Sequence, residues 1–203
     1  MKERGMIFNA EMVNAILSGR KTQTRRPVKF PFRDVNLGCE LSGNELAGEL
    51  SAGNYWNSRV GQPGDRIWVR ETWAEAGASA PDLTLYRANY PEHVPAHYEN
   101  VPPVDEIRWT PSIHMPRWAS RILLEITDVR VERLNNISYD DAISEGITQE
   151  WTCIDPGLGS YAHKNDVQDD YETLWKSIYG EESWAANPWV WVISFKRIEG
   201  SAL

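Results

Sequence analysis

The chain has 203 residues, of which 41% are hydrophobic and 25% are charged, and its formal net charge is −8. These proportions are ordinary for a folded globular protein and exclude a disordered chain. The negative charge argues against sequence-independent binding to long nucleic acids, because such binding depends mainly on contacts of Lys and Arg with phosphates. We expect a single domain over residues 1–203, with insertions at residues 27–63 and 76–116.

Cysteine usage and the amino-terminal sequence both indicate a cytoplasmic protein. Cys39 and Cys153 form no metal-binding pair and no disulfide framework, which favours a reducing compartment. Asn9, Glu11 and Asn14 interrupt the apolar stretch that a signal peptide needs, and the chain has no run of ~18 apolar residues. We therefore expect a protein of the cytoplasm that does not bind membranes. The sequence leaves its oligomeric state open.

The first predicted helix covers residues 9–18. Asn9 is placed as its N-cap, apolar residues follow at helical spacing, and Gly19 stands where a helix usually stops. Lys21 therefore comes just after the end of a short helix. The following stretch, up to residue 64, is rich in Gly, Asn, Ser and Pro, which predicts a long excursion with little regular structure.

β-Branched and aromatic residues then predict strands. Residues 66–73 are expected to form one, with Glu71 on its apolar face. The turn-rich insertion that follows contains residues 83–87, which have strand character. Residues 121–133 give the longest strand signal in the chain, which fits two strands or one strongly bent strand.

Two helices and a strand are predicted in the last third of the chain. Ser138 begins a short capped helix that stops at Gly146, so Glu145 lies at a helix end. Residues 169–179 predict an amphipathic helix, and residues 189–195 predict a central strand because both faces are apolar. We expect an α+β fold that is mainly β, in which a small mixed β-barrel carries a few short peripheral helices and long loop insertions.

A basic segment interrupts this acidic chain. Six cations and no acidic residue lie between Arg20 and Arg33. A helix C-terminus explains Gly19 and Arg20, but the helix dipole acts only within about one turn. The remaining cations therefore indicate a binding partner.

Common cofactor and metal motifs are not found in the sequence. It has neither the phosphate-loop pattern G-x-x-x-x-G-K-[ST] nor the dinucleotide pattern G-x-G-x-x-G. His93 and His97 lie in a Pro-containing loop with no Glu between them, which is typical of surface histidines. We expect no metal and no organic cofactor.

Gly19, Lys21 and Arg26 fit the pattern G-x-K-x-x-x-x-R, which resembles the signature of ASCH domains, PUA-like barrels related to RNA-binding modules. Three further segments are similar to phage- and prophage-encoded ASCH proteins: residues 66–73, 114–121 and 187–195. The resemblance implies a PUA-like barrel.

Small bacterial members of this family are amidohydrolases that deacetylate N4-acetylcytidine, and they carry a run similar to residues 19–26. Their Lys–Thr–Glu triad corresponds by resemblance to Lys21, Thr24 and Glu145 here. Glu71 is the alternative carboxylate.

The resemblance also implies roles for these side chains. Thr24 would attack the acyl carbon, and Lys21 would accept the threonine proton and pass it to the leaving amine. Glu145 would hold Lys21, and burial would have to lower the pKa of the lysine for it to act as a base. Arg26 or backbone amides near Gly19 would stabilise the oxyanion. Attack by Lys21 itself stays open.

The two long insertions have no equivalent in those shorter family members and are expected to reshape the mouth of the pocket. We name Arg70, Glu71, Trp73 and Trp118 as further binding candidates, because tryptophans stack planar ligands.

The expected function is that of a metal-independent amidohydrolase, which removes the acyl group from an N4-acylated cytosine nucleoside or a related acylated base. The alternative is a non-catalytic module of phage origin that binds RNA, single-stranded or modified nucleic acid, with Arg25, Arg26 and Lys29 contacting phosphates. A third possibility, a phage assembly factor, has no recognisable site in the sequence.

Overall fold

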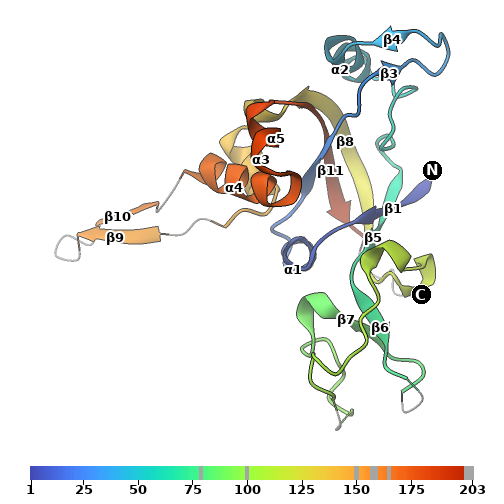
Figure 1. The fold of residues 1–203 in the computed structure, drawn as a ribbon, viewed down its shortest axis with the longest axis vertical. Helices are drawn as coiled ribbons and strands as arrows, with labels where there is room; N and C mark the ends of the chain where they lie inside the picture. The colour runs from blue at the N-terminus through green and yellow to red at the C-terminus, as the bar shows by residue number, and fades with distance from the viewer. Residues whose placement is uncertain (78–79, 99–100, 149–150, 156–159, 164–165, 199–203) are drawn as a thin grey trace. The chain divides into compact units, whose positions relative to one another are not determined.

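The structure is a computed structural model that describes residues 1–77, 80–98, 101–148, 151–155, 160–163 and 166–198. Figure 1 shows the course of the chain. Its residues divide into two compact units: unit 1 holds residues 1–19, 64–125 and the chain from 196 onward, and unit 2 holds residues 20–63 and 126–195. The expectation of a single domain stays a prediction.

Unit 1 begins with a strand and a helix. Its elements are β1 (Glu3–Ile7), α1 (Ala10–Leu17), β5 (Arg66–Arg70), β6 (Trp73–Glu75) and β7 (Thr84–Tyr86), with the short 3-10 helices η1 (Arg87–Asn89), η2 (Ser112–His114) and η3 (Arg117–Ala119). The side chain of Asn9 accepts a hydrogen bond from the N–H of Met12, and Gly19 has φ +77°, so both predicted ends of α1 are confirmed. Ile67, Val69 and Glu71 are all buried, as the predicted alternation requires. The predicted strand over residues 66–73 is not continuous, because β5 ends at Arg70 and Trp73 begins β6.

Unit 2 contains most of the helices. Its elements are β2 (Gln23–Pro27), β3 (Phe32–Arg33), β4 (Glu40–Leu41), α2 (Gly43–Ser51), η4 (Leu134–Asn136), α3 (Tyr139–Ser144), β9 (Trp151–Asp155), β10 (Ser160–His163), α4 (Val167–Tyr179) and α5 (Glu181–Ala185). Two long strands, β8 (Leu123–Arg133) and β11 (Trp189–Arg197), have residues in both units. The signal at residues 121–133 thus belongs to one strand.

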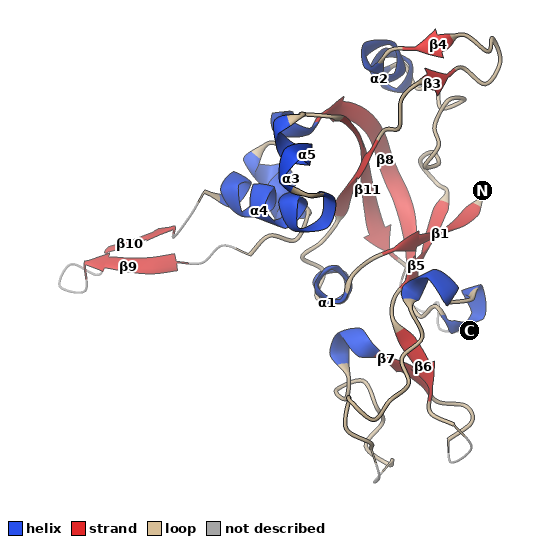
Figure 2. Ribbon diagram, viewed as in Figure 1, coloured by secondary structure: helices blue, strands red, loops and turns tan. Residues whose placement is uncertain are grey.

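The largest sheet has the strand order β1-β5-β8-β11-β2, drawn in red in Figure 2. β1 runs parallel to β5, whereas the β5–β8 and β11–β2 pairs are antiparallel. The α+β class, the mixed sheet and the central position of β11 are therefore confirmed. Among the described residues the strand order does not close on itself, so the structure shows an open sheet where we expected a barrel.

The first insertion is more regular than predicted. Ser42 and Glu45 form a capping box at the start of α2, and the helix buries Leu46 and Leu50. β3 and β4 form an antiparallel pair just before this helix. The expectation of little regular structure between residues 27 and 64 was wrong, because a capped amphipathic helix forms within a Gly- and Ser-rich sequence.

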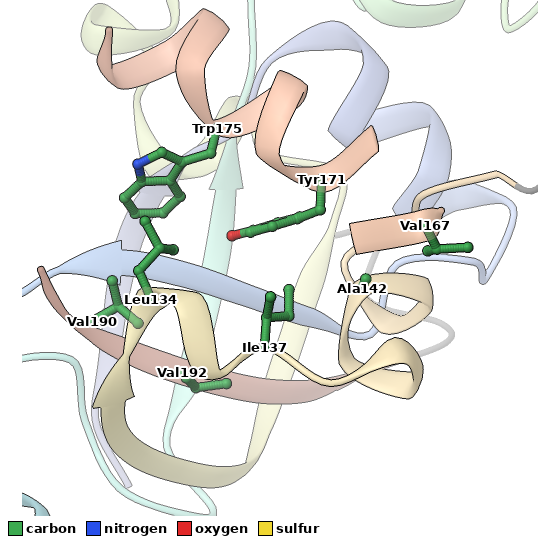
Figure 3. Packing of buried hydrophobic residues seen from close by; sticks show 8 residues of the cluster. All are labelled: Leu134, Ile137, Ala142, Val167, Tyr171, Trp175, Val190 and Val192. Atoms are coloured by element: carbon green, nitrogen blue, oxygen red, sulfur yellow. The ribbon is translucent and has the colours of Figure 1, made fainter. Parts of the chain in front are cut away.

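A hydrophobic cluster in unit 2 fixes α3 and α4 against β11 (Figure 3). It consists of Leu134, Ile137, Ala142, Val167, Tyr171, Trp175, Val190 and Val192. The predicted amphipathic helix contributes Tyr171 and Trp175, whereas Ile178 is exposed. This packing holds the C-terminal end of α3 in place.

No helix in the described ranges is long and apolar enough to cross a bilayer.

Candidate functional site

Lys21 lies in unit 2, separated from the start of β2 by Thr22. Two backbone hydrogen bonds fix its neighbour Thr22: its N–H donates to the carbonyl of Ser144, 2.8 Å away, and its carbonyl accepts from the N–H of Phe195, also at 2.8 Å. The chain at Lys21 is thereby tied to the end of α3 and to β11. The lysine side chain is buried, and only 2% of the residue is exposed.

Glu145 is the C-cap residue of α3. Ser138 caps the start of the helix by accepting a hydrogen bond from the N–H of Asp141, and Gly146, with φ +95°, ends it as predicted. Lys21 Nζ lies 2.6 Å from Glu145 Oε2 and donates a second hydrogen bond, of 2.8 Å, to the Glu145 carbonyl oxygen. The structure therefore brings Lys21 and Glu145 together in a buried ion pair.

Arg25 shares the same carboxylate. Its Nη1 lies 3.3 Å from Glu145 Oε1 and also donates to Gln23 Oε1. Its Nη2 lies 2.6 Å from Glu132 Oε1 and 2.9 Å from Asp141 Oδ2. The arginine side chain is fully buried, so these acidic groups balance a charge that has no access to water.

Arg130 extends this network at its solvent side. Its Nη2 donates to both carboxylate oxygens of Asp141 at 2.9 Å, and its Nε lies 3.2 Å from Glu132 Oε2. Burial alone would raise the pKa of Asp141, but hydrogen bonds from Gln23 and Arg130, together with the charges of Arg25 and Arg130, lower it to about 2. The carboxylate is therefore ionised throughout the physiological range.

In Lys21, by contrast, the surroundings disfavour the charged form. Burial lowers its pKa below the ordinary value and outweighs the charge and hydrogen bond of Glu145, which act to raise it. The neighbouring charges of Arg26 and Arg25 lower the pKa further. A neutral amine has two N–H donors and one lone pair. Because the carboxylate and carbonyl of Glu145 accept two hydrogen bonds, the lone pair of neutral Lys21 would point away from Glu145 and be free to accept a proton.

Thr24 is not joined to this pair. Its side chain is on the opposite face of β2 from Gln23 and Arg25, which contact the acidic groups of α3, because side chains alternate along a strand. The residue is 0% exposed, and among the described residues its hydroxyl has no hydrogen-bond partner. Thr24 is thus a buried, unsatisfied hydroxyl three residues from Lys21.

The alternative carboxylate, Glu71, is held in unit 1. Its two oxygens accept from Nε and Nη2 of Arg121 at 2.9 Å each, and burial raises its pKa despite this partner. Arg70 donates to the carbonyl oxygens of Ser112 and Ile113, so it ties a loop to β5. Glu145, and not Glu71, is the carboxylate that contacts Lys21.

The two predicted tryptophans of unit 1 contact each other. The rings of Trp73 and Trp118 meet edge to face, with centroids 5.3 Å apart. Trp73 is buried, whereas Trp118 is 66% exposed and lines a cavity of about 800 Å³ with Tyr86 and Arg121. Trp118 is therefore available to a ligand.

Arg26 and Gly19 complete the predicted set. Arg26 is half-buried, donates a hydrogen bond of 3.4 Å to the carbonyl of Arg25 and lines a cavity in unit 2. Gly19 supplies the positive φ that turns the chain from α1 towards Lys21.

Sequence reasoning missed the acidic network around Arg25. Counting in steps of two from Lys21 places Gln23 and Arg25 on the same side of the chain, and this signal could have indicated a shared partner. Arg25 was instead assigned to phosphate contacts in the nucleic-acid alternative. That assignment was wrong, because its guanidinium is buried against Glu132, Asp141 and Glu145.

Within the described ranges, no three His, Cys, Asp or Glu side chains are grouped as metal ligands. His93 packs against the rings of Tyr86 and Tyr90, and its Nε2 accepts a hydrogen bond from the N–H of Tyr86.

The chain was compared with family profiles, curated proteins and solved structures. No family profile and no curated protein matches the chain. The chain is similar to a solved structure described as the ASCH domain from Lactobacillus crispatus JV V101, with 15% sequence identity and a TM-score of 0.40 over 97% of this chain and 79% of that one. A TM-score below 0.5 does not assign a fold, so the ASCH resemblance rests on the sequence motif.

Proposed function

We propose that this protein is an amidohydrolase that removes the acyl group from an N4-acylated cytosine nucleoside or a related acylated base. In this proposal it is a phage-type ASCH protein with a PUA-like fold that acts in the bacterial cytoplasm without a metal or organic cofactor. One observation carries the proposal: the Nζ of a buried lysine with a lowered pKa lies 2.6 Å from the carboxylate of Glu145.

The proposed reaction has two halves. Neutral Lys21 accepts the proton of the Thr24 hydroxyl while Thr24 Oγ1 attacks the acyl carbon, which gives a tetrahedral oxyanion. The C–N bond then breaks, and Lys21 returns the proton to the leaving exocyclic amine. Water hydrolyses the resulting threonine ester, with Lys21 again as the base, and the acid is released as its carboxylate.

Positioning and charge stabilisation come from neighbouring groups. Glu145 accepts two hydrogen bonds from Lys21 and so fixes the direction of its lone pair. Arg26 is close enough for its charge to lower the pKa of Lys21, and with backbone amides near Gly19 it is the proposed donor to the oxyanion. Lys21 and Thr24 are buried, and the Thr24 hydroxyl lies on the opposite face of β2 from the network that holds Lys21. Substrate entry must therefore open their surroundings and rearrange this segment before the proton can pass between them.

Turnover of acylated bases tests this proposal. We would incubate the protein with a panel of N4-acylcytidines and other acylated bases and measure the released products by mass spectrometry. Lys21→Met, Thr24→Val and Glu145→Gln should each lose at least about two orders of magnitude in kcat/KM, the usual scale for removal of a catalytic acid or base. Thr24→Ser should retain turnover because it keeps the hydroxyl.

Glu71→Gln is the matched control, because Glu71 is also a buried carboxylate paired with a cation. It should retain turnover in preparations whose thermal melting shows a folded protein. Loss in Lys21→Met with full activity in Thr24→Val would make Lys21 itself the nucleophile. No turnover of any acylated base by folded wild type would reject the enzyme, and salt-sensitive binding of oligonucleotides would then favour the binding module.

A further inference from the structure

The cavity in unit 2 that Arg26 lines has a strongly cationic rim. It has a volume of about 530 Å³ and lies where β2 ends and the chain turns into the first insertion. Its lining includes Arg26, Lys29, Arg33 and Arg59. Among the described residues that line it, none is acidic. A protein with a formal net charge of −8 therefore has four cations around one hollow.

Local structure holds these cations at the rim. Arg26 is paired with Trp191 across β2 and β11, and its side chain points away from the face that carries buried Arg25. The guanidinium of Arg59 lies 5.1 Å from the ring centroid of Phe32, and its Nη2 donates to the Arg33 carbonyl oxygen at 3.4 Å. An anion in this cavity would be attracted by all four cations.

The walls below the rim are largely apolar. They are formed by Pro27, Pro31, Phe32, Val60 and Trp191. The rings of Phe32 and Trp191 are buried with centroids 6.0 Å apart, which gives a rigid floor. An inorganic anion would need only the cations, whereas a ligand with an attached ring system would also bury apolar surface against these walls.

We propose that this cavity binds a nucleoside 5′-polyphosphate, with its phosphates at the cationic rim and its base and sugar against the apolar walls. Guanidinium groups bind phosphate oxygens through paired, charge-assisted hydrogen bonds, and four positive charges suit a multiply charged group better than a monoanion. The cavity volume lies within the range of small-molecule sites. Arg26, the proposed oxyanion donor, lines this cavity, whereas none of the three residues of the proposed catalytic triad does.

Equilibrium binding of a fluorescently labelled nucleoside triphosphate to the full chain tests this inference. Measured by anisotropy at low salt, affinity should fall from triphosphate to monophosphate to unphosphorylated nucleoside, and inorganic triphosphate should compete more weakly than the nucleotide. Lys29→Gln and Arg59→Gln should each weaken binding about tenfold, the scale of one charge-assisted hydrogen bond.

Exposed cations elsewhere give matched controls. Lys2→Gln and Arg108→Gln remove the same charges from unit 1 and should leave the affinity unchanged. Because Lys29 and Arg59 are also exposed, all four variants should fold, which thermal melting can verify.

Three results would overturn the inference. Equal affinity for inorganic triphosphate and the nucleotide would reduce the cavity to a simple anion site. Binding that is lost equally in the control variants, or is not detected, would remove the site. Oligonucleotides that displace the nucleotide with affinity rising with length would identify a nucleic-acid surface instead. None of these results depends on turnover of acylated bases, so the two proposals can fail separately.

Discussion

At the scale of single residues, the site is a set of buried charges that balance one another. Glu145 is shared between Lys21 on one oxygen and Arg25 on the other, so its charge is matched without solvent. Arg25 in turn needs Glu132 and Asp141. Removing one member leaves an uncompensated buried charge, which is strongly destabilising.

Asp141 allows this balance to be measured as stability against pH. Its pKa is lowered from 3.8 to about 2 in the folded protein. The carboxylate therefore contributes stability that is present above pH 3.8 and is lost as pH falls through about 2, an effect of about 2 kcal/mol at neutral pH.

We predict that Asp141→Asn lowers the free energy of unfolding at neutral pH by at least about 2 kcal/mol and removes this acid-dependent loss. Urea denaturation at neutral and acid pH would measure both effects. Asp140→Asn, at the exposed neighbouring position, should change stability by no more than about 0.5 kcal/mol. Equal effects of the two substitutions would contradict the network.

At the scale of elements, the residues that cap the helices could be predicted from the sequence, whereas close contacts between elements could not. Asn9, Ser138 and Gly146 marked the ends of α1 and α3 in the sequence, and the structure places them there. The strand β1 was missed because Gly5 weakens a strand pattern. A Cβ at this position would lie 2.6 Å from the Trp68 ring, so glycine is needed for contact between the strands.

The helix α2 was also missed, although its capping box could be read from Ser42 and Glu45. Two glycines within the helix obscured the signal, because glycine has low helix propensity. The two glycines have different surroundings. A Cβ at Gly43 would lie 2.1 Å from the Trp189 ring, whereas a Cβ at Gly48 would have nothing within 4 Å.

These glycines give a matched pair of substitutions. Gly43→Ala should destabilise the protein by about 1–3 kcal/mol, because the Trp189 ring must move to admit the methyl group. Gly48→Ala should stabilise it by about 0.5–1 kcal/mol through helix propensity. Thermal or urea unfolding would measure both, and destabilisation by both to the same extent would show that α2 does not pack against Trp189 in this way.

At the scale of the whole molecule, the basic segment is divided between two environments. Lys21 and Arg25 form ion pairs with acidic residues in a buried network. Arg26, Lys29 and Arg33 instead line a cavity. The sequence showed the excess of cations but not this division. Lys21 and Glu145 are 124 residues apart, and only the family resemblance linked them before the fold was described.

Fold class and the main strands could be predicted because they depend on local patterns of apolar residues. Closure of the sheet and the surroundings of Thr24 depend on packing between distant segments, which local patterns do not encode. Thr24 matched the triad by sequence, yet its hydroxyl lies on the opposite face of β2 from the charged network. Its catalytic role stays a proposal.

The most direct test of this account is the pKa of the Lys21 amine. NMR titration of ¹³C-labelled lysine side chains would give it, with the Lys21 signals assigned by their loss in Lys21→Met. We predict a midpoint below 10.5 in the wild type, because burial disfavours the ammonium, and a still lower midpoint in Glu145→Gln, because the carboxylate that raises the pKa is gone. A midpoint at or above 10.5 would contradict the account, since Lys21 would then be a permanent cation and not a base.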